Sequence, residues 1–306
     1  MTAEHPTARN SSDRPRTVMV VGATGRTGRH VVAGLLEAGV GVQALVRTPA
    51  TADLPDEVTV IPGTLTDVDA VRRAATGADA AFLMWLGHDP AEVGPTVTAL
   101  TEQVSHVVYL SAADLQADSG PTGVVQPGVY AEVEAAIERS GRTWTFVRGG
   151  GFAANALEWA DQVRAGNTVR LPHPEAGRSV VDERDLAEVA VRGLLDPSMA
   201  GRAFALTGPE TLTLRQQVGV IGHVLGRDLV VAERDADEVR SEYAAFMGAD
   251  FADQVLGYWA TLTDHPEPVT TGVEAALGRT ARPFVDWVHL HRAEFDAQDL
   301  GDPTPR

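Results

Sequence analysis

The residues with the clearest chemical signature form a glycine-rich loop, residues 22–28, directly after an apolar run and at the start of a helical pattern. Glycines at a strand–turn–helix junction let the backbone approach a pyrophosphate, while the helix N-terminus supplies N–H donors. The loop therefore predicts dinucleotide binding; the competing interpretation is a tight turn without a ligand. The loop residues expected to contact the dinucleotide are Gly22, Thr24, Gly25, Arg26, Thr27 and Gly28.

Arg47 stands at the end of the second predicted strand, about 20 residues beyond the glycines, where dinucleotide-binding chains contact the adenosine ribose. An acidic residue there would favour a free 2′-hydroxyl, whereas an arginine accommodates a 2′-phosphate. Arg26 is placed to contact the same phosphate. The two arginines predict NADP(H) rather than NAD(H); the alternative is that both are solvated surface residues.

Three more predicted strands end in residues that could face a ligand, because open α/β sheets bind ligands at the carboxyl ends of their strands. Ser111 could polarise a carbonyl group or cap the turn after its strand. Trp85 either borders the nicotinamide or fills the core. Gly150 and Phe152 either meet the nicotinamide, with Phe152 as a wall, or belong to a flexible connector.

Two residue types are missing from the 306 residues: all 25 basic residues are Arg, and there is no Cys. The lack of Lys excludes Schiff-base chemistry, a Walker-type phosphate site and a Tyr–Lys catalytic pair. The lack of Cys excludes thiolate nucleophiles and Cys-ligated zinc. His289 and His291 are two residues apart on a predicted helix and do not share a face, so no metal site is predicted.

These residues need a scaffold, and the first half of the chain alternates apolar runs with helical patterns. Continuous apolar strands separated by helices indicate βαβ units and a parallel sheet. The predicted strands are Thr17–Val21, Val40–Val46, Glu57–Ile61, Ala78–Trp85, His106–Ser111 and Thr143–Arg148. The predicted helices between them are Arg26–Ala38, Asp67–Thr76, Pro90–Gln103 and Gly128–Arg139. The expected fold class is α/β, a Rossmann-type doubly wound parallel sheet.

The second half is expected to form a smaller, mostly helical C-terminal lobe. Its predicted helices are Phe152–Arg164, Asp185–Leu195, Leu214–Leu225, Ala236–Met247, Phe251–Leu262 and Pro283–Phe295, with strands at Ala203–Leu206 and Leu229–Ala232. We expect a disordered tail over residues 1–16, an NADP-binding domain over 17–150, a substrate-binding lobe over 151–298 that is partly interleaved with it, and a frayed tail over 299–306.

Charge and hydropathy bear on partners and location. The net charge is −17, which disfavours direct nucleic-acid binding. No apolar run reaches the ~20 residues of a membrane helix, and the N-terminus has no signal-peptide core. With no Cys, these features predict a cytoplasmic protein, and Arg without Lys is typical of a high-GC bacterial genome. The expected partner is a small-molecule substrate; the sequence is compatible with a monomer or a homodimer.

Several motifs together resemble the NmrA-like branch of the atypical short-chain dehydrogenase/reductase superfamily, from about residue 17 to residue 295. They are the Gly22–Gly28 loop, Val46-Arg47, Pro62–Asp67, Val107–Ser111, Glu132–Glu134, Ser140-Gly141, Trp144–Arg148, Gly151-Phe152 with Asn155, and Leu206–Glu210. The resemblance implies a Rossmann lobe that binds NADP(H) and a smaller lobe that covers the substrate. The family includes reductases of quinones and also proteins that bind the dinucleotide as a signal.

The chain departs from the family pattern in two places. Thr64 stands where many members carry an Asp that meets the adenine, which leaves the neighbouring backbone and Leu65 for that contact. The superfamily's Tyr-x-x-x-Lys pair is absent. Aligning on Glu132–Glu134 puts Tyr130 where the family often has a basic residue, and Gln126 where the superfamily has its Tyr.

The missing Lys limits the chemistry. Tyr130 alone is a weak acid, with a reference pKa of about 10. Hydride transfer to a quinone or an enone needs less general-acid catalysis, because the developing negative charge is delocalised. Ser111 and Tyr130 are the predicted catalytic residues, as hydrogen-bond donors to the carbonyl oxygen. The sequence thus predicts an NADPH-dependent oxidoreductase acting on a small conjugated carbonyl acceptor, in detoxification or secondary-metabolite tailoring. The alternatives are an NADP(H)-sensing regulator without catalysis, and a non-redox isomerase or cyclase.

Overall fold

The computed structural model describes residues 17–85, 89–113 and 129–296. The predicted tails, 1–16 and 299–306, and Gln126 lie outside the described residues. The chain divides into two compact units, and each unit is made of several segments of the sequence. Within the described residues, the first unit comprises 17–85, 89–111, 129–148 and 186–204, and the second comprises 112–113, 149–185 and 205–296.

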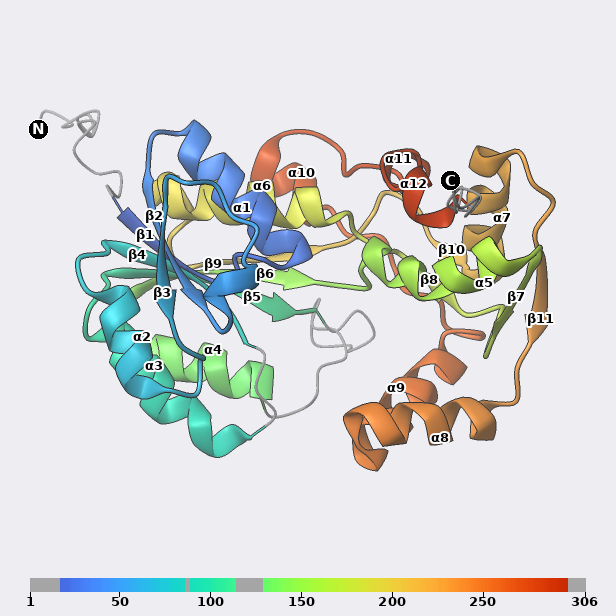
Figure 1. The fold of residues 1–306 in the computed structure, drawn as a ribbon, viewed down its shortest axis with the longest axis horizontal. Coiled ribbons are helices and arrows are strands. Elements are labelled where there is room, and N and C mark those ends of the chain that lie inside the picture. Colours follow the sequence, from blue (N-terminus) through green and yellow to red (C-terminus); the bar gives the residue numbers. More distant parts are fainter. Residues whose placement is uncertain (1–16, 86–88, 114–128, 297–306) are drawn as a thin grey trace, which may run out of the picture. The chain divides into compact units, whose positions relative to one another are not determined.

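A seven-stranded sheet in the order β3-β2-β1-β4-β5-β6-β9 forms the scaffold of the first unit (Figure 1). Strand β1 pairs in parallel with β2 on one side and with β4 on the other, and the pairs β2–β3 and β4–β5 are also parallel. This is the order of a doubly wound sheet, so the predicted fold class is confirmed. The strands are β1 (Thr17–Val21), β2 (Gly41–Val46), β3 (Val58–Pro62), β4 (Ala80–Met84), β5 (His106–Ala112), β6 (Thr143–Gly149) and β9 (Arg202–Leu206).

Helices cover both faces of the sheet, with α2, α3 and α4 on one face and α1 and α6 on the other (Figure 1). Helix α2 begins where the sequence predicts, because the Asp67 carboxylate accepts hydrogen bonds from the backbone N–H groups of Asp69 and Ala70. Predicted helix Pro90–Gln103 begins with a 3₁₀ turn, η3 (Pro90–Glu92). The helices are α1 (Arg26–Glu37), α2 (Val68–Ala75), α3 (Val93–Thr101), α4 (Val129–Arg139) and α6 (Glu183–Leu195), with further 3₁₀ turns η2 (Pro49–Thr51) and η5 (Pro197–Met199).

The apolar core of this unit lies between the sheet and helices α2, α3 and α4. Alternate residues of β5 face it, among them Val107 and Tyr109, because side chains alternate along a strand. The opposite face packs closely against α6: a Cβ at Gly193 would lie 3.2 Å from side-chain atoms of Val108 and Thr145.

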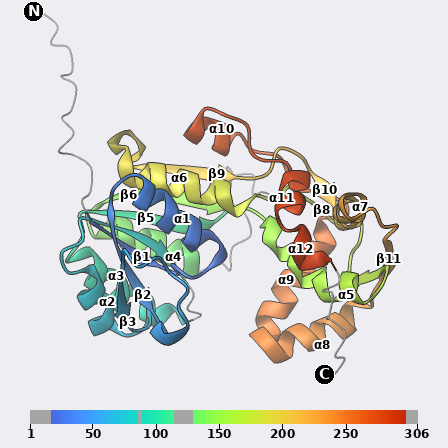
Figure 2. The ribbon, with the colours of Figure 1, turned by 45° about the horizontal axis from the view of Figure 1, so that its top comes forward.

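The second unit is mostly helical, and it contains short strands that the sequence patterns do not predict. Its elements are η4 (Ala153–Trp159), α5 (Ala160–Ala165), β7 (Thr168–Leu171), β8 (Gly177–Arg178), β10 (Leu212–Thr213), α7 (Leu214–Leu225), β11 (Val230–Glu233), α8 (Ala236–Met247), α9 (Ala249–Thr261), α10 (Gly272–Leu277), α11 (Phe284–Leu290) and α12 (Arg292–Phe295). Figure 2 shows α8 and α9 running side by side.

Two helices predicted for this unit differ from the observed ones. Predicted helix Phe152–Arg164 starts as the 3₁₀ segment η4, and the backbone N–H of its first residue, Ala153, bonds the carbonyl of Val181. Predicted helix Pro283–Phe295 is interrupted at His291, whose ring stacks on Trp287, with the ring centroids 4.4 Å apart.

A buried carboxylate, Glu267, joins distant parts of the second unit. It is 2% exposed. Its oxygens accept hydrogen bonds from Arg178 Nε (3.2 Å) and Nη2 (3.1 Å), from the Ser179 backbone N–H (2.9 Å) and from the Tyr258 hydroxyl (2.7 Å). The buried charge of Glu267 is therefore paired and fully hydrogen-bonded, which is the condition under which burial of a charge is tolerated.

A second buried carboxylate, Asp185, lies at the start of α6. It accepts hydrogen bonds from Arg279 Nη2 (2.7 Å), from the Arg282 backbone N–H (2.7 Å) and from the Arg282 guanidinium. Close by in sequence, the Glu183 carboxylate accepts the indole N–H of Trp287 at 2.8 Å. These contacts fasten the segment before α11, and α11 itself, to the start of α6.

Candidate functional site

The glycine loop lies at the point where the strand order of the sheet reverses, between β1 and β4. Gly22 follows β1 with φ = +77°, a conformation that glycine adopts without strain. A Cβ on Gly22 would lie 2.3 Å from Cε of Met84, the last residue of β4. In open α/β sheets this crevice, outside the carboxyl ends of the strands, is where nucleotides bind.

The loop fits a dinucleotide by its own geometry. A Cβ on Gly28 would lie 1.9 Å from the Gly22 carbonyl oxygen, so only glycine allows the turn to close this tightly. Gly25 is the N-cap of α1, and no side chain caps this helix and no acidic residue stands in its first turn. The N–H groups at the start of α1 are thus left for an anion, and the helix dipole favours one there.

Three other loop residues are predicted to contact the dinucleotide. Thr24 and Arg26 are exposed, whereas Thr27 is buried in the first turn of α1. Arg47 is exposed immediately after β2. Neither Arg26 nor Arg47 forms an ion pair within the part of the chain that the structure describes. Both guanidinium groups are therefore available at the positions where the sequence predicts a 2′-phosphate.

Arg29 is a loop-side cation that the sequence analysis did not single out. Its Nε and Nη2 lie 3.4 Å from the carbonyl oxygens of Gly25 and Thr24. The signal was available, because residue 29 stands one turn after the N-cap of a helix that follows a glycine loop. Its position adds positive charge beside the N-terminus of α1.

Ser111 and Trp85 share one face of the sheet at the carboxyl ends of β5 and β4. Ser111 is 3% exposed, and Trp85 is equally buried within the core beside α2, α3 and α4. The indole N–H of Trp85 has no hydrogen-bond partner within the described residues. Trp85 thus contributes to the core, as one of the two interpretations expects, while keeping a free donor.

Tyr109 links the two predicted catalytic residues, although no sequence motif assigns it a role. It lies two residues before Ser111 on the same face of β5, and its pKa is raised by burial and by nearby Tyr130 and Glu134, against a smaller effect of Ser111. Its hydroxyl makes no aligned hydrogen bond within residues 17–85, 89–113 and 129–296. The structure therefore gathers three hydroxyl groups, those of Tyr109, Ser111 and Tyr130, between β5 and α4.

Tyr130 is a weaker acid than the sequence analysis assumed, because burial raises its pKa. One helical turn later, at the spacing of the missing Tyr–Lys pair, stands Glu134. The guanidinium of Arg148, at the end of β6, binds Glu134 with Nε–Oε1 and Nη2–Oε2 distances of 3.0 and 2.6 Å. Arg148 cannot act as a free cation toward Tyr130, since Glu134 neutralises it, so Tyr130 is suited to donate a hydrogen bond and not a proton.

The other predicted contacts lie where their strands end. Leu65 is 9% exposed, with its side chain in the core and its carbonyl accepting from the Thr96 hydroxyl at 3.2 Å. Gly150 and Phe152 belong to the second unit, where the Gly150 N–H bonds the Leu206 carbonyl and Phe152 bridges to Val181. The roles of these three residues toward a dinucleotide stay predictions.

The glycine after Gly150 has a structural reason. A Cβ on Gly151 would lie 2.5 Å from Nη2 of Arg178, so the guanidinium of Arg178 occupies the space a side chain would need. The connector is therefore packed against a buried cation at Gly151.

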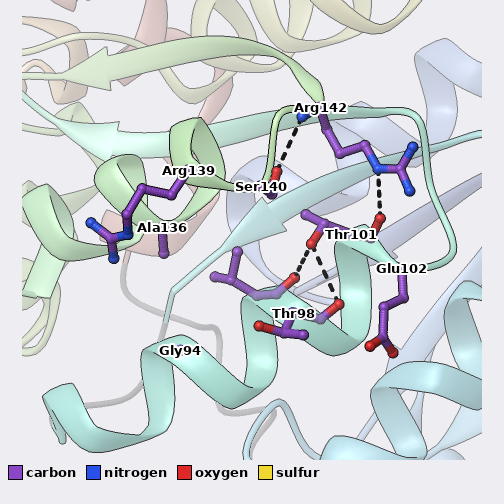
Figure 3. Close-up of a pocket in the computed structure, with 9 residues that line it drawn as sticks. Gly94, Thr98, Thr101, Glu102, Ala136, Arg139, Ser140 and Arg142 are labelled. Atoms are coloured by element: carbon purple, nitrogen blue, oxygen red, sulfur yellow. Dashed lines mark hydrogen bonds between the residues drawn. The ribbon is translucent and has the colours of Figure 1, made fainter.

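A pocket of about 400 Å³ lies between α3 and α4 (Figure 3). Its lining includes Thr98, Thr101, Arg139 and Arg142, and Arg142 Nε donates to the Thr101 carbonyl at 2.8 Å. These residues are at the ends of helices that lead into β5 and β6, so the pocket is at the amino edge of those strands. It is on the opposite edge from the glycine loop and is no part of the predicted dinucleotide site.

Metal sites and membrane-spanning helices are two other features that could carry a function. Within the described residues, no group of three or more His, Asp or Glu side chains is arranged to hold a metal ion. None of the described helices combines the length and the hydropathy that crossing a bilayer requires.

Comparison with known sequences identifies relatives along most of the chain. The profile of a family described as NAD(P)H-binding matches residues 22–197. The chain is 35% identical over 283 residues to the (4-alkanoyl-5-oxo-2,5-dihydrofuran-3-yl)methyl phosphate reductase of Streptomyces griseus, covering 91% of this chain and 99% of the relative. It is 29% identical over 288 residues to the NAD(P)H azoreductase of Xenophilus azovorans, covering 92% and 99%.

Solved structures share the fold at low sequence identity. The NADPH complex of an NADPH-dependent quinone oxidoreductase from Escherichia coli superimposes with a TM-score of 0.73 at 18% identity, covering 90% of this chain and 99% of that one. NmrA, a negative transcriptional regulator solved in complex with NAD, superimposes with a TM-score of 0.67 at 17% identity, covering 90% and 94%.

Proposed function

The chain belongs to the NAD(P)H-binding family, within the NmrA-like, atypical short-chain dehydrogenases/reductases, and is an NAD(P)H-dependent oxidoreductase; from this premise we propose that it reduces the activated carbon–carbon double bond of a small conjugated carbonyl compound. The observation that carries the proposal is the absence of an acid at the expected place. The chain has no Lys, burial raises the pKa of Tyr130, and Glu134 neutralises Arg148.

A conjugated acceptor suits such a site because it stabilises its own negative charge. NADPH, when bound, supplies the hydride. A simple ketone would become a strongly basic alkoxide, whereas an enone becomes a delocalised enolate, and a general acid is worth about 10²–10⁴-fold where the charge is localised. Neutral hydroxyl donors at Ser111 and Tyr130 would stabilise the enolate oxygen by hydrogen bonds.

The 35% identical relative supports an enone over a quinone. The name of its substrate describes a ring double bond conjugated both to a lactone carbonyl and to an alkanoyl group. Hydride addition to that bond gives an enolate spread over two carbonyl groups, which is the charge sink that a chain without Lys requires. We propose an acceptor of this doubly activated type for the present protein.

The acceptor class is tested by NADPH oxidation against a 4-alkanoyl-2,5-dihydrofuran-5-one, a benzoquinone and an unconjugated ketone. We expect turnover of the first two, fastest for the furanone, and at least a hundredfold lower kcat/KM for the ketone. Efficient reduction of the ketone would refute the proposal, and so would tight NADPH binding without turnover of any acceptor.

We propose further that NADPH is preferred over NADH, supported by Arg26 and Arg47, which form no ion pair among the residues that the structure describes. In calorimetric titrations NADPH should bind at least tenfold more tightly than NADH, or about 1.4 kcal/mol. Arg47→Ala should lose that discrimination while NADH affinity changes little. Arg139→Ala is the matched control, because Arg139 is an exposed arginine at the opposite sheet edge. Equal affinities in the wild type would contradict the assignment.

A further inference from the structure

The pocket between α3 and α4 has no role in the fold or in the proposed function. Its volume of about 400 Å³ is within the range of small-molecule sites. Its lining residues lie on α3, on α4 and on the turns that follow these helices, so the whole pocket belongs to the first unit. The outermost lining residues along α3, Gly94 and Glu102, are eight positions apart, which is about 12 Å of helix.

Two arginines line this pocket without a carboxylate partner. Arg139 and Arg142 are exposed, and neither forms an ion pair among the residues that the structure describes. Nε of Arg142 donates to the Thr101 carbonyl at 2.8 Å, which holds the side chain at the end of α3 and leaves its two Nη groups for other acceptors. Figure 3 shows the guanidinium groups of Arg139 and Arg142 toward opposite ends of the pocket. The pocket therefore presents a cation near each end.

The other arginines of the first unit show that this arrangement is not general. Four of them pair with carboxylates, namely Arg72, Arg73, Arg148 and Arg192. Arg202 lies over the ring of Phe204, with its guanidinium carbon 4.6 Å from the ring centroid. The rest without a carboxylate partner among the described residues are those of the predicted cofactor site, Arg26, Arg29 and Arg47. In a chain of net charge −17, the pocket thus resembles the predicted cofactor site in its uncompensated positive charge.

One carboxylate, that of Glu102, also lines the pocket. Its Oε2 accepts a hydrogen bond from Nε of Arg72 at 3.3 Å, and Nη1 of Arg72 donates to Asp69 at 3.3 Å. The charge of Glu102 is therefore partly balanced by an arginine outside the lining. Two arginines and one paired carboxylate leave the pocket with a net positive charge, which favours an anionic ligand.

Apolar groups line the pocket between its charged residues. Val97 on α3 and Ala136 on α4 are 2% and 9% exposed. The hydroxyl of Thr101 donates to the Val97 carbonyl at 2.7 Å, and that of Ser140 donates to the Ile137 carbonyl at 2.6 Å. These two hydroxyl groups therefore keep their hydrogens within the protein, and a ligand meets mainly apolar surface between the two cations.

We propose that this pocket binds a small dicarboxylate, an apolar chain with a carboxylate group at each end. Arg139 and Arg142 each bind one carboxylate, because a guanidinium offers paired N–H donors that match the geometry of a carboxylate. The chain lies against Val97 and Ala136. The pocket is at the amino edge of β5 and β6, away from the glycine loop, so this inference does not depend on the proposed function.

The first test compares three probes that share an eight-carbon chain: octanedioate, octanoate and 1,8-octanediol. Calorimetric titrations use the protein saturated with NADPH, so that no probe occupies the dinucleotide site. Octanedioate should bind about three- to fivefold more tightly than octanoate, the effect of one additional exposed ion pair, and the diol should not bind. The affinity for octanedioate should fall as NaCl is raised from about 50 to about 300 mM, because salt screens exposed charges.

The second test changes one charge at a time. Arg139→Ala removes one of the two cations, so the preference for octanedioate over octanoate should disappear. Glu102→Gln removes a negative charge from the lining, so octanedioate should bind about threefold more tightly. Arg202→Ala is the matched control, an exposed arginine of the same unit outside the pocket, and should leave the affinities for both probes unchanged. All three variants should bind NADPH as the wild type does.

Arg139 carries the decisive comparison, because its side chain makes no hydrogen bond or ion pair among the described residues that the variant would break. Arg142→Ala should also weaken octanedioate binding, and thermal unfolding of that variant shows whether losing the bond to Thr101 disturbs the fold. Equal affinities of the wild type for octanedioate and octanoate would overturn the assignment, and so would an unchanged preference in Arg139→Ala. Failure of the NADPH-saturated wild type to bind octanedioate would overturn it as well.

Discussion

The two units bury different kinds of polar side chain. Among the described residues, those buried in the first unit are neutral hydroxyl groups, namely Thr27, Thr96, Thr101, Ser111 and Thr145. The second unit buries charges as well: Arg178, Asp182, Glu183, Asp185 and Glu267. A buried hydroxyl is satisfied by one nearby carbonyl, whereas a buried carboxylate needs a cation and several donors.

The difference appears in the sequence separation of the partners. The buried hydroxyl groups of Thr101, Thr96 and Thr145 bond carbonyls 4, 31 and 54 residues away. Glu267, Asp185 and Glu183 bind partners 89, 94 and 104 residues away, at Arg178, Arg279 and Trp287. These hydroxyl groups of the first unit therefore find partners closer in the sequence and need no counter-charge, whereas the carboxylates of the second unit depend on more distant segments.

The largest expected effect is the loss of a buried charge partner in the second unit. Glu267→Gln keeps one acceptor oxygen, enough for Ser179 or for Tyr258 but not for both, and leaves the Arg178 guanidinium buried without a counter-charge. Breaking such a pair costs about 3–5 kcal/mol. The measurement is the free energy of unfolding in denaturant, with Glu210→Gln as an exposed control expected to change it by less than about 0.5 kcal/mol.

Replacing both residues of the Glu267–Arg178 pair separates the effect of charge pairing from the effect of packing. Replacing both partners, Glu267→Met with Arg178→Met, should cost less than Glu267→Gln alone, because no charge is then left unpaired. A double variant that is less stable than the single one would show that packing around Gly151, and not charge pairing, dominates this site.

In the first unit, the expected losses of stability come from contact between a new Cβ atom and the backbone. Gly28→Ala should destabilise the protein by about 1–3 kcal/mol, because its Cβ would lie 1.9 Å from the Gly22 carbonyl oxygen and the turn must open. Gly25→Ala should cost less stability than Gly28→Ala, since its Cβ would lie 3.1 Å from that oxygen and a small backbone shift relieves the contact, yet it should weaken NADPH binding where the pyrophosphate approaches. Thermal unfolding and calorimetric titration of both variants separate the two roles. Native NADPH affinity in Gly25→Ala would contradict the predicted approach.

The smallest effect concerns His106, a histidine of the first unit whose pKa is shifted. Burial lowers the pKa of His106 from its ordinary value near 6.5, against the opposing hydrogen bonds to Gly193 and Thr143. Below pH 6.5 the unfolded chain therefore takes up a proton that the folded one resists, so stability is lost as pH falls through this range. His106→Asn should show a weaker dependence of the unfolding free energy on pH between 7 and 5. An identical slope in the variant would mean that His106 does not contribute.

Much of the first unit follows from local sequence signals. The strand at Thr17–Val21 has the predicted bounds, and the Asp67 cap starts α2 as expected. Predictions were weaker in the second unit. Two-residue strands such as β8 and β10 are too short to leave a periodic pattern, and the break of the last helix at His291 is marked by neither Gly nor Pro.

The residues of the candidate site also fall into two groups, those that the sequence identifies and those that it does not. The glycine loop, Arg47 and Ser111 could be identified because each stands at a strand end, which the sequence marks. Tyr109 could not, since an aromatic residue inside an apolar strand looks like any core residue until its hydroxyl is seen beside Tyr130.

By itself, the sequence determined the doubly wound sheet, the glycine loop and the absence of a lysine acid, because these depend on residue type and short spacing. Tertiary structure alone decided which charges are buried and paired, and that Arg148 is neutralised by Glu134. The physical reason is the range of the interactions: hydrophobic periodicity and backbone sterics act between neighbours in sequence, whereas desolvation and charge pairing depend on which distant groups the fold brings together.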